Sequence, residues 1–313
     1  MTRVAVATAF GGPEVVEIVD EVVAQPAAGQ VLIEIRASGV NPIDWKLYSG
    51  AFGSDESTLP MRLGSEAAGV VEAVGAGATG PAGPISVGDE VIVTGVTGAY
   101  AERLLAPGDA VLPKPSSLSW EEAAGFLLVA GTAYDTLEVA SVAEGDTVLV
   151  HGAAGGVGSL VVQAALGRGA RVIGTARPEN HDALRAYGAE PVEYGDGLRE
   201  RVGALAPDGV DAAIDTVGTD EAVDVSLALV SDRSRIVTIA AFGRAEQDGF
   251  PSVGGGNAES AERRKAARLT LVAAARDGEL TVPVAKTFPL DRAADAHREL
   301  QGRHPRGKFV LVP

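Results

Sequence analysis

The stretch Thr147–Ala170, TVLVHGAAGGVGSLVVQAALGRGA, decides the fold of this chain. A run of apolar, largely β-branched residues leads into a cluster of glycines, and apolar residues at helical spacing follow. This order predicts a strand, a tight turn and a helix, which together form the first βα unit of a dinucleotide-binding sheet. The amide groups and the dipole at the start of such a helix bind a pyrophosphate.

The glycine turn departs from the fingerprint G-x-G-x-x-G at its first position. Ala153 replaces the first glycine, whereas Gly155 and Gly158 keep the second and the third. The second glycine allows a close approach of the backbone to the pyrophosphate, and the third allows the helix to pack on the strand. The residues predicted to bind the pyrophosphate are Ala153, Ala154, Gly155, Gly156, Val157 and Gly158.

A second stretch, Gly75–Gly80 (GAGATG), matches the fingerprint letter for letter and also follows a strand-like run. The residues after it, Pro81-Ala82-Gly83-Pro84, cannot open a regular helix with an apolar stripe, because of their prolines and glycine. A pyrophosphate loop must open a helix. We therefore interpret Gly75–Gly80 as a loop between strands, and the imperfect match after His151 as the cofactor site.

The rest of the chain contains two kinds of sequence. Before Ser119 most segments are short, rich in β-branched residues and separated by Gly and Pro, which is typical of an all-β, barrel-like domain. Beyond it, strand-like and helix-like segments alternate, which predicts a parallel, doubly wound sheet. The tail from Val282 resembles the first part again. We therefore predict a β-rich domain of residues 1–118 and 284–313, and a dinucleotide-binding domain of residues 119–283.

The composition is that of a globular protein and disfavours several classes of function. With 313 residues, 46% of them apolar, the chain is long enough for two domains. Its formal charge of −16 makes nucleic acid a poor partner, because phosphate binding needs a basic surface. Cys is absent and the His are scattered, so we predict no metal site. We find neither a membrane span nor a signal peptide, and we expect a cytoplasmic protein.

The strand after the glycine turn ends without the acidic residue that NAD sites use. In those sites an Asp or Glu about 20 residues after the glycines binds the ribose 2′-hydroxyl. Here Ala176 stands at that place, between Thr175 and Arg177. Without a carboxylate a 2′-phosphate is not repelled, and Arg177 offers it a planar fork of donors. The sequence therefore favours NADPH; the alternative is that Arg177 only faces solvent.

Several segments resemble, in their order along the chain, the medium-chain dehydrogenase/reductase superfamily, and within it the zinc-independent, quinone oxidoreductase-like (zeta-crystallin-like) branch. They are SGVNPIDWKLYSG (38–50), LGSEAAGVVEAVG (63–75), VGDEV (87–91), GAYAERLLAP (98–107), GTAYDTL (131–137), HGAAGGVG (151–158) and GKFVLVP (307–313). The resemblance implies an α/β protein with a GroES-like substrate domain built from both chain ends and a central Rossmann domain. It also implies a homodimer.

The chain departs from its relatives at three positions. Ser65 stands where the zinc-dependent members have a metal-binding His, so the resemblance implies chemistry without zinc. Lys46 stands where the quinone oxidoreductase branch often has Tyr, and Tyr48 where related sequences often have Arg. If a Tyr serves some members as proton donor, then Lys46, Tyr48 or water has to replace it here.

The candidate catalytic residues follow from the resemblance and from the chemistry of hydride transfer. Asn41 is predicted to hydrogen bond the substrate or cofactor, Asp44 to position Lys46 or a ribose hydroxyl, and Lys46 to stabilise a developing enolate. Thr132 completes the set. In the alternative interpretation, Asp44 only caps the turn after the proline that precedes it, and Lys46 is a solvated charge.

Further cofactor contacts are expected at the carboxyl ends of the sheet strands, where ligands bind in such sheets. His151, directly before the glycine turn, is interpreted as a packed strand-end residue rather than an acid. The predicted contacts at these strand ends are Thr175, Val217, Gly218, Ala240, Ala241 and Phe242. The resemblance further implies that Tyr194 lies near the adenosine phosphate and that Arg303 reaches the cofactor.

These features together predict an NADPH-dependent, zinc-independent reductase of quinones or α,β-unsaturated carbonyl compounds. One alternative is an enoyl-thioester reductase, which would need a basic patch for its carrier; AERRKAAR (261–268) is a small candidate. Another alternative is a binding protein that senses NADPH without turnover, because one fold hosts many functions.

Overall fold

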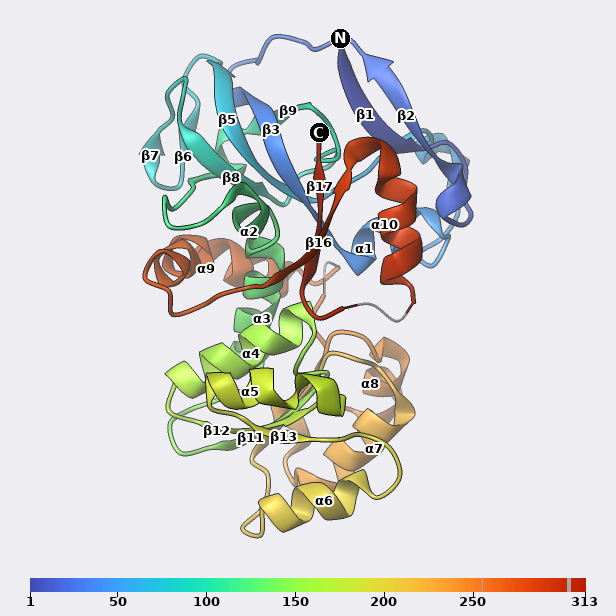
Figure 1. The fold of residues 1–313 in the computed structure, drawn as a ribbon, viewed down its shortest axis with the longest axis vertical. Helices are drawn as coiled ribbons and strands as arrows, with labels where there is room; N and C mark the ends of the chain where they lie inside the picture. Colours follow the sequence, from blue (N-terminus) through green and yellow to red (C-terminus); the bar gives the residue numbers. More distant parts are fainter. Residues whose placement is uncertain (255, 303–304) are drawn as a thin grey trace. The chain divides into compact units, whose positions relative to one another are not determined.

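The computed structural model describes residues 1–254, 256–302 and 305–313, which form two compact units (Figure 1). The first unit comprises Met1–Leu128, Val272–Asp277 and Val282–Pro313, and the second comprises Val129–Leu271 and Gly278–Thr281. The domain boundaries expected from the sequence, after residues 118 and 283, stay a prediction; the compact units first divide ten residues later, after Leu128.

The first unit consists mostly of short strands, as the sequence predicts. The strands are β1 (Thr2–Ala7), β2 (Val16–Glu21), β3 (Gln30–Val40), β4 (Met61–Arg62), β5 (Glu66–Val74), β6 (Thr79–Gly80), β7 (Gly83–Pro84), β8 (Glu90–Thr94), β9 (Arg103–Pro107), β10 (Val111–Pro113), β16 (Val284–Pro289) and β17 (Lys308–Val312). The helices are α1 (Pro42–Tyr48), α2 (Trp120–Ala124) and α10 (Ala293–Leu300). Single-turn 3-10 helices lie at Pro13–Val15, Glu56–Thr58, Gly108–Ala110 and Leu290–Arg292.

Strand β3 organises this unit. One edge of β3 pairs with β5, and the other edge pairs first with β9 and then with β17 (Figure 1). Val40 at the end of β3 lies opposite Phe309 of β17. The sheet order is β10-β8-β5-β3-β17-β16, so the late strands β16 and β17 complete a sheet that the early strands begin. This confirms the prediction of a β-rich domain built from both ends of the chain.

The stretch that matches the fingerprint letter for letter opens no helix. Thr79–Gly80 forms β6, which pairs with β7. A Cβ atom on Gly75 would lie 1.9 Å from the carbonyl oxygen of Ala27, and Gly77 has a φ of +69°. Gly75 is therefore required by lack of space for a side chain, and Gly77 is favoured by its backbone conformation; neither glycine needs a ligand to explain it.

The second unit alternates strands and helices. The strands are β11 (Thr147–His151), β12 (Arg171–Thr175), β13 (Glu190–Val192), β14 (Ala212–Asp215) and β15 (Ile236–Thr238). The helices are α3 (Leu127–Val139), α4 (Gly156–Gly167), α5 (His181–Tyr187), α6 (Leu198–Leu205), α7 (Asp220–Leu229), α8 (Phe242–Asp248) and α9 (Ala258–Arg276); α3 and α9 each have one end in the first unit. Single-turn 3-10 helices lie at Pro178–Asn180 and Arg233–Arg235.

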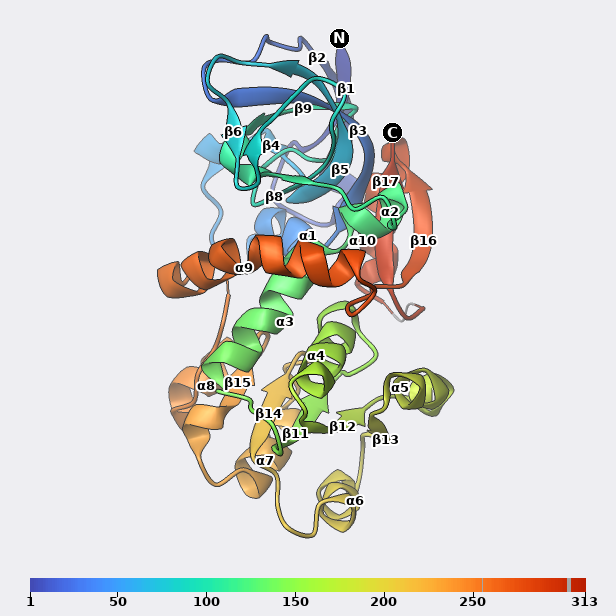
Figure 2. The same ribbon diagram turned by 90° about the vertical axis from the view of Figure 1, so that its left-hand side faces the viewer.

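The five strands of the second unit are all parallel, in the order β13-β12-β11-β14-β15 (Figure 2). Thr238 in β15 also forms a parallel bridge with Ser252, which extends the sheet by one more short segment. This is the strand order of the doubly wound dinucleotide-binding fold. The order reverses between β11 and β14, and ligands of such sheets bind outside the carboxyl ends of the strands at that point.

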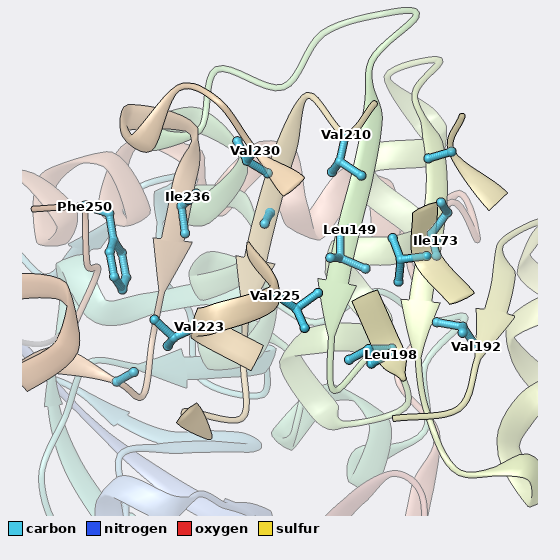
Figure 3. Packing of buried hydrophobic residues seen from close by; sticks show 14 of the residues in the cluster. Leu149, Ile173, Val192, Leu198, Val210, Val223, Val225, Val230, Ile236 and Phe250 are labelled. Carbon is cyan, nitrogen blue, oxygen red and sulfur yellow. The ribbon is translucent and has the colours of Figure 1, made fainter. Parts of the chain in front are cut away.

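A buried apolar cluster holds helices to one face of this sheet (Figure 3). Leu149, Ile173 and Ile236 come from β11, β12 and β15, and they meet residues of α6 and α7 such as Leu198 and Val223. The apolar period of two along the strands and the helical period of α6 and α7 bring these side chains to the same layer. The layer keeps the strand ends in register.

The segment after Ser119 forms two helices, α2 and α3. Ser119 caps α2, because its hydroxyl accepts the amide of Glu122. The helix ends at Gly125, where a Cβ atom would lie 3.2 Å from the side chain of Lys308. Within the part of the chain that the structure describes, no helix has both the length and the apolar character that a membrane crossing requires.

Gly158 tests the packing of α4 on the sheet. A Cβ atom on Gly158 would lie 2.2 Å from the carbonyl oxygen of Gly152, so Gly158→Ala is expected to lower the free energy of unfolding by about 1–3 kcal/mol. Gly203 in α6 has open space at its Cβ position, and Gly203→Ala should be stabilising by about 0.5–1 kcal/mol. Urea unfolding of both variants checks this, and equal effects of the two would contradict it.

Candidate functional site

The glycine turn between β11 and α4 is shaped by hydrogen bonds to the end of β12. The amide of Gly152 donates to Oγ1 of Thr175 at 3.1 Å, and the amide of Ala153 donates to the carbonyl oxygen of Thr175 at 3.0 Å. Gly152 has a φ of +73°. Ala153 and Thr175 are buried, so these two predicted contacts support the turn from beneath.

The start of α4 presents amide groups that the helix itself does not use. Gly155 precedes the helix, and its carbonyl oxygen accepts the amide of Ser159 at 2.9 Å. The amides of Gly156, Val157 and Gly158 therefore lie in the first turn, ahead of the first intrahelical bond. A helix N-terminus of this kind binds anionic groups, because its amides and its dipole both favour negative charge.

Arg177 and Tyr194 follow the next two strands of the sheet, as predicted. Arg177 forms an ion pair with Glu179 at 3.3 Å, and the side chain of Glu179 is half exposed. An exposed pair of this kind contributes at most about 1 kcal/mol, so a dianionic ligand can compete for the guanidinium. Tyr194 after β13 is 50% exposed.

A buried network at the ends of β14 and β15 holds two further predicted loops. Asp215 is buried, and its Oδ1 accepts the amides of Val217 and Gly218, each at 2.9 Å. Its Oδ2 accepts the hydroxyl of Thr238 at 2.7 Å. Sequence reasoning missed Asp215 and Thr238, although both are polar residues at the ends of apolar strands, which is a usable signal.

Thr238 carries this network on to the loop after β15. Its Oγ1 accepts the amide of Ala240 at 3.0 Å and that of Ala241 at 2.9 Å. Phe242 opens α8 and is 44% exposed. The predicted contacts therefore share the carboxyl edge of the parallel sheet, except Arg303, which lies outside the described residues.

His151 ends β11 and is buried, which agrees with its interpretation as a packed residue. Its Nε2 lies 3.1 Å from the hydroxyl of Ser226, and that hydroxyl donates to the carbonyl oxygen of Ala222. Burial lowers the pKa of His151 to about 4 and keeps the ring neutral, although Asp215 opposes this shift. His151 therefore serves the packing of α7 on the sheet.

In the first unit, Asn41 belongs to a buried ionic cluster that the sequence did not indicate. Lys308 Nζ donates to Oδ1 of Asn41 at 2.5 Å and to the carbonyl oxygen of Val40 at 2.9 Å, and it pairs with Oε1 of Glu66 at 3.4 Å. Nδ2 of Asn41 donates to Oε1 of Glu66 at 3.0 Å, and Oε2 of Glu66 accepts the amide of Leu128 at 2.9 Å.

This cluster gives Asn41 a structural role; its predicted contact with substrate or cofactor stays a prediction. Both ends of its amide are engaged inside the protein, and the residue is only 1% exposed. Because the three members satisfy one another, the cluster is rigid and holds the start of α1 against β5 and β17. Asn41 therefore positions the start of α1.

Asp44 is also buried, and its carboxylate has three donors. Oδ1 accepts the hydroxyl of Ser65 at 2.7 Å, while Oδ2 accepts the hydroxyl of Tyr100 and the amide of Asn41, both at 2.8 Å. The bond from Asn41 caps α1, as one sequence interpretation expected. These partners replace the predicted contact between Asp44 and Lys46. Burial raises the pKa of Asp44 to about 6, against the opposing effect of its hydrogen bonds.

The hydrogen bonds of Asp44 continue into α10. The hydroxyl of Tyr100 lies 3.2 Å from Nε2 of His297, and the hydroxyl of Tyr48 lies 2.7 Å from Nδ1 of the same ring. Tyr48 and His297 are fully buried. Tyr48 therefore cannot replace a catalytic Tyr as proton donor, which corrects that option.

The other two candidate catalytic residues have different settings. Lys46 is half-buried on α1, and its Nζ atom lies 5.9 Å from the centre of the ring of Trp45. Thr132 is buried in α3 and belongs to the second unit. The structure thus brings Asn41, Asp44 and Lys46 together in one short helix.

Two arginines of the basic segment at 261–268 lie next to a buried carboxylate of the protein itself. Nε of Arg263 donates to the buried carboxylate of Asp135 at 2.6 Å, and Arg264 lies 3.7 Å from the same carboxylate. Arg264 also donates to the carbonyl oxygens of Ser260 and Gly254. Arg263 and Arg264 therefore hold α9 on α3, which removes two charges from the patch that a thioester carrier would need.

Comparison with known proteins places these sites in context. Residues 27–116 match the family described as alcohol dehydrogenase GroES-like domain, and residues 181–311 match the family described as zinc-binding dehydrogenase. Zinc does not fit this chain: it has no Cys, and in the ranges 1–254, 256–302 and 305–313 no three His, Asp or Glu cluster as a metal site.

Similar proteins cover nearly the full length. A quinone oxidoreductase of Pseudomonas aeruginosa is 34% identical over 97% of this chain and 98% of its own. The structure of an Escherichia coli quinone oxidoreductase complexed with NADPH aligns over 100% of both chains, with 29% identity and a TM-score of 0.86. A segment of the polyketide synthase GfsB of Streptomyces halstedii, 5% of that protein, is 34% identical over 91% of this chain.

Thr238→Val tests the network at the strand ends. The change keeps the shape but leaves Oδ2 of Asp215 and two amides without their partner, so the free energy of unfolding is expected to fall by about 2–3 kcal/mol. Thr238→Ser keeps the hydroxyl and serves as the matched control. Urea unfolding measures both, and a Val variant as stable as the Ser variant would refute the role of the network.

His297 predicts a dependence of stability on pH. Burial lowers its pKa to about 4, whereas the unfolded chain takes up the proton near pH 6.5, so stability is lost as the pH falls. Between pH 7.5 and 5.5 this group alone should remove about 1 kcal/mol, partly offset by Asp44, whose raised pKa has the opposite sign. His297→Gln should therefore show a smaller loss, measured by urea unfolding at both pH values. An equal loss in both proteins would contradict the assignment.

Proposed function

The chain belongs to the quinone oxidoreductase family of the medium-chain dehydrogenases/reductases, and on this premise we propose what it reduces. The membership confirms the resemblance seen in its motifs. The protein is an NADPH-dependent oxidoreductase. We propose that its acceptor is a quinone or an α,β-unsaturated carbonyl compound.

The observation that carries this proposal is the start of α4. The amides of Gly156, Val157 and Gly158 suit a pyrophosphate, and the missing Cβ atom of Gly158 lets α4 approach the turn that follows β11. The residues present therefore fit a dinucleotide. Bound NADPH supplies a hydride. Asp215 and Thr238 hold the loops that follow β14 and β15, so the exposed side chains of Val217 and Phe242 are ready to contact it.

The donor set of the chain supports a conjugated acceptor. When a quinone or enone takes up a hydride, the negative charge moves to an oxygen atom, where hydrogen-bond donors suffice to stabilise it. Lys46 is half-buried on α1 and is a candidate for that role. A simple alcohol or ketone needs stronger polarisation; the chain has no Cys to bind zinc, and no cluster of three His, Asp or Glu lies among the residues that the structure describes.

A second candidate is an enoyl-thioester reductase, favoured by the likeness to a polyketide synthase segment. The pairing of Arg263 and Arg264 with Asp135 counts against recognition of an acidic carrier at 261–268. A protein that only senses NADPH is the remaining alternative. The homodimer stays a prediction, which light scattering can measure.

The experiment that tests the function is anaerobic oxidation of NADPH with quinones, enones and enoyl-thioesters in parallel. Saturable turnover with quinones or enones is expected, with weaker turnover of enoyl-thioesters. Preference for a thioester would support the second candidate. Tight NADPH binding without any turnover would favour the sensor.

Arg177 predicts the preference for NADPH. Arg177→Ala removes the guanidinium fork and is expected to raise the KM for NADPH about tenfold, with little effect on the KM for NADH. Glu179→Gln is the matched control, because it removes the competing carboxylate and should lower the KM for NADPH slightly. Steady-state kinetics with both cofactors decide the matter; equal changes for NADPH and NADH in Arg177→Ala would reject the assignment.

A further inference from the structure

We propose that Ser65 is the proton donor of the reduction and that Asp44 supplies its proton. The inference rests on the proposed function and deepens it. It comes from a chain of hydrogen-bonded side chains in the first unit that the sequence did not indicate. The chain contains Ser65, Asp44, Tyr100, His297 and Tyr48.

Four of the five hydrogen-bonded residues are buried, and the fifth, Ser65, is partly exposed. Asp44, Tyr100, His297 and Tyr48 are each at most 1% exposed, whereas Ser65 is half-buried. Of these five residues, Ser65 is therefore the one that a molecule outside the protein can reach. A proton that leaves along these bonds passes through the hydroxyl of Ser65.

The partners of Asp44 decide where an added proton sits. Oδ2 already accepts two donors, the hydroxyl of Tyr100 and the amide of Asn41. Oδ1 faces only the hydroxyl of Ser65, which can reverse its role from donor to acceptor. A protonated Asp44 therefore donates from Oδ1 to Ser65, and the hydroxyl hydrogen of Ser65 turns outward.

The inner part of the chain holds this arrangement in place. Because the hydroxyl of Tyr100 donates to Asp44, its oxygen accepts from Nε2–H of His297, and Nδ1 of the ring accepts the hydroxyl of Tyr48. Burial lowers the pKa of His297 and keeps the ring neutral, which this pattern requires. His297 and the two tyrosines are positioning residues.

Burial and the groups around Asp44 together set the pH at which its carboxylate takes up a proton. Burial raises its pKa to about 6, while Lys308 from β17 and the donors Ser65, Tyr100 and Asn41 oppose the rise. The charge of Lys308 is itself paired with Glu66 from β5. The facing group from α10 is the neutral His297. About half of the protein thus carries the proton at pH 6, and about a tenth at pH 7.

The chemical step balances in protons and electrons. The acceptor receives a hydride at carbon, and the electron pair of its conjugated system moves to the carbonyl oxygen. That oxygen takes the proton of Ser65 while Ser65 takes the proton from Oδ1 of Asp44. Asp44 remains as a carboxylate and regains a proton from solvent after the product leaves. The sum is acceptor, NADPH and one proton going to reduced acceptor and NADP⁺.

Three variants separate this role from a structural one. Ser65→Ala removes the donor, and kcat with an enone should fall about 100-fold, without the loss of rate above pH 6 that we expect for the unaltered protein. Ser65→Thr keeps a hydroxyl and should retain both the rate and the pH profile. Asp44→Asn mimics the protonated carboxyl in its hydrogen bonds but gives up no proton, so it should fold and be as slow as Ser65→Ala.

Tyr100→Phe gives a readout that a merely structural role would not move. The change removes a donor to Oδ2 of Asp44, so the pKa of Asp44 rises. The midpoint of the kcat profile should then move upward by about one pH unit. Ser57→Ala, an exposed serine whose hydroxyl bonds only Asp55 among the described residues, is the control and should leave the midpoint unchanged.

Infrared spectroscopy of the cofactor-free protein tests the proton store without turnover. A carbonyl band of a protonated carboxyl group should titrate with a midpoint near pH 6 and be absent in Asp44→Asn. Absence of this band from the unaltered protein would overturn the proposal. An unchanged kcat and pH profile in Ser65→Ala would also overturn it. If Lys46→Met then abolished the pH dependence, Lys46 would be the proton donor instead. If the unaltered protein reduced no acceptor at all, the proposed function would fail and this inference with it.

Discussion

The first unit depends on the ion pair between Lys308 and Glu66, which is buried among three strands. Removing two charges from water costs several kcal/mol each unless both are paired and hydrogen bonded. Here Asn41 and the carbonyl oxygen of Val40 complete the shell of the ammonium group, and the amide of Leu128 completes that of the carboxylate. A slip in register of β17, β3 or β5 would break the set, so the pair fixes the sheet and, through Asn41, the start of α1.

The parts that could be predicted from the sequence are those whose reason is local. The turn at Gly152–Gly158 is one, because a strand, glycines and a helix follow one another directly, and the exclusion of Gly75–Gly80 followed from the prolines next to it. The parallel order of the second unit followed from the alternation of element types. The tight packing at Gly125 did not follow from any local pattern, because its neighbour Lys308 lies far away in the chain.

The interior of the candidate site could not be predicted, because its partners are far apart in sequence. His297 lies 249 residues from Tyr48 and 197 from Tyr100, and no spacing rule relates them. Asn41 and Asp44 were found through a resemblance, yet their burial and their partners depend on the closed sheet. The same holds for the ion pair of Arg263, because its partner Asp135 lies 128 residues away in the sequence.

The place of β17 in the sheet bears on the order in which the protein matures. Strands β3 and β5 are synthesised early, but β17 follows the whole of the second unit along the chain. During synthesis the second unit has all its strands before the first unit can close, and domains generally fold as units as they emerge. Until Lys308 is synthesised, Glu66 lacks its ion-pair partner. The part of the β3 edge that β17 covers in the finished protein stays unpaired until then.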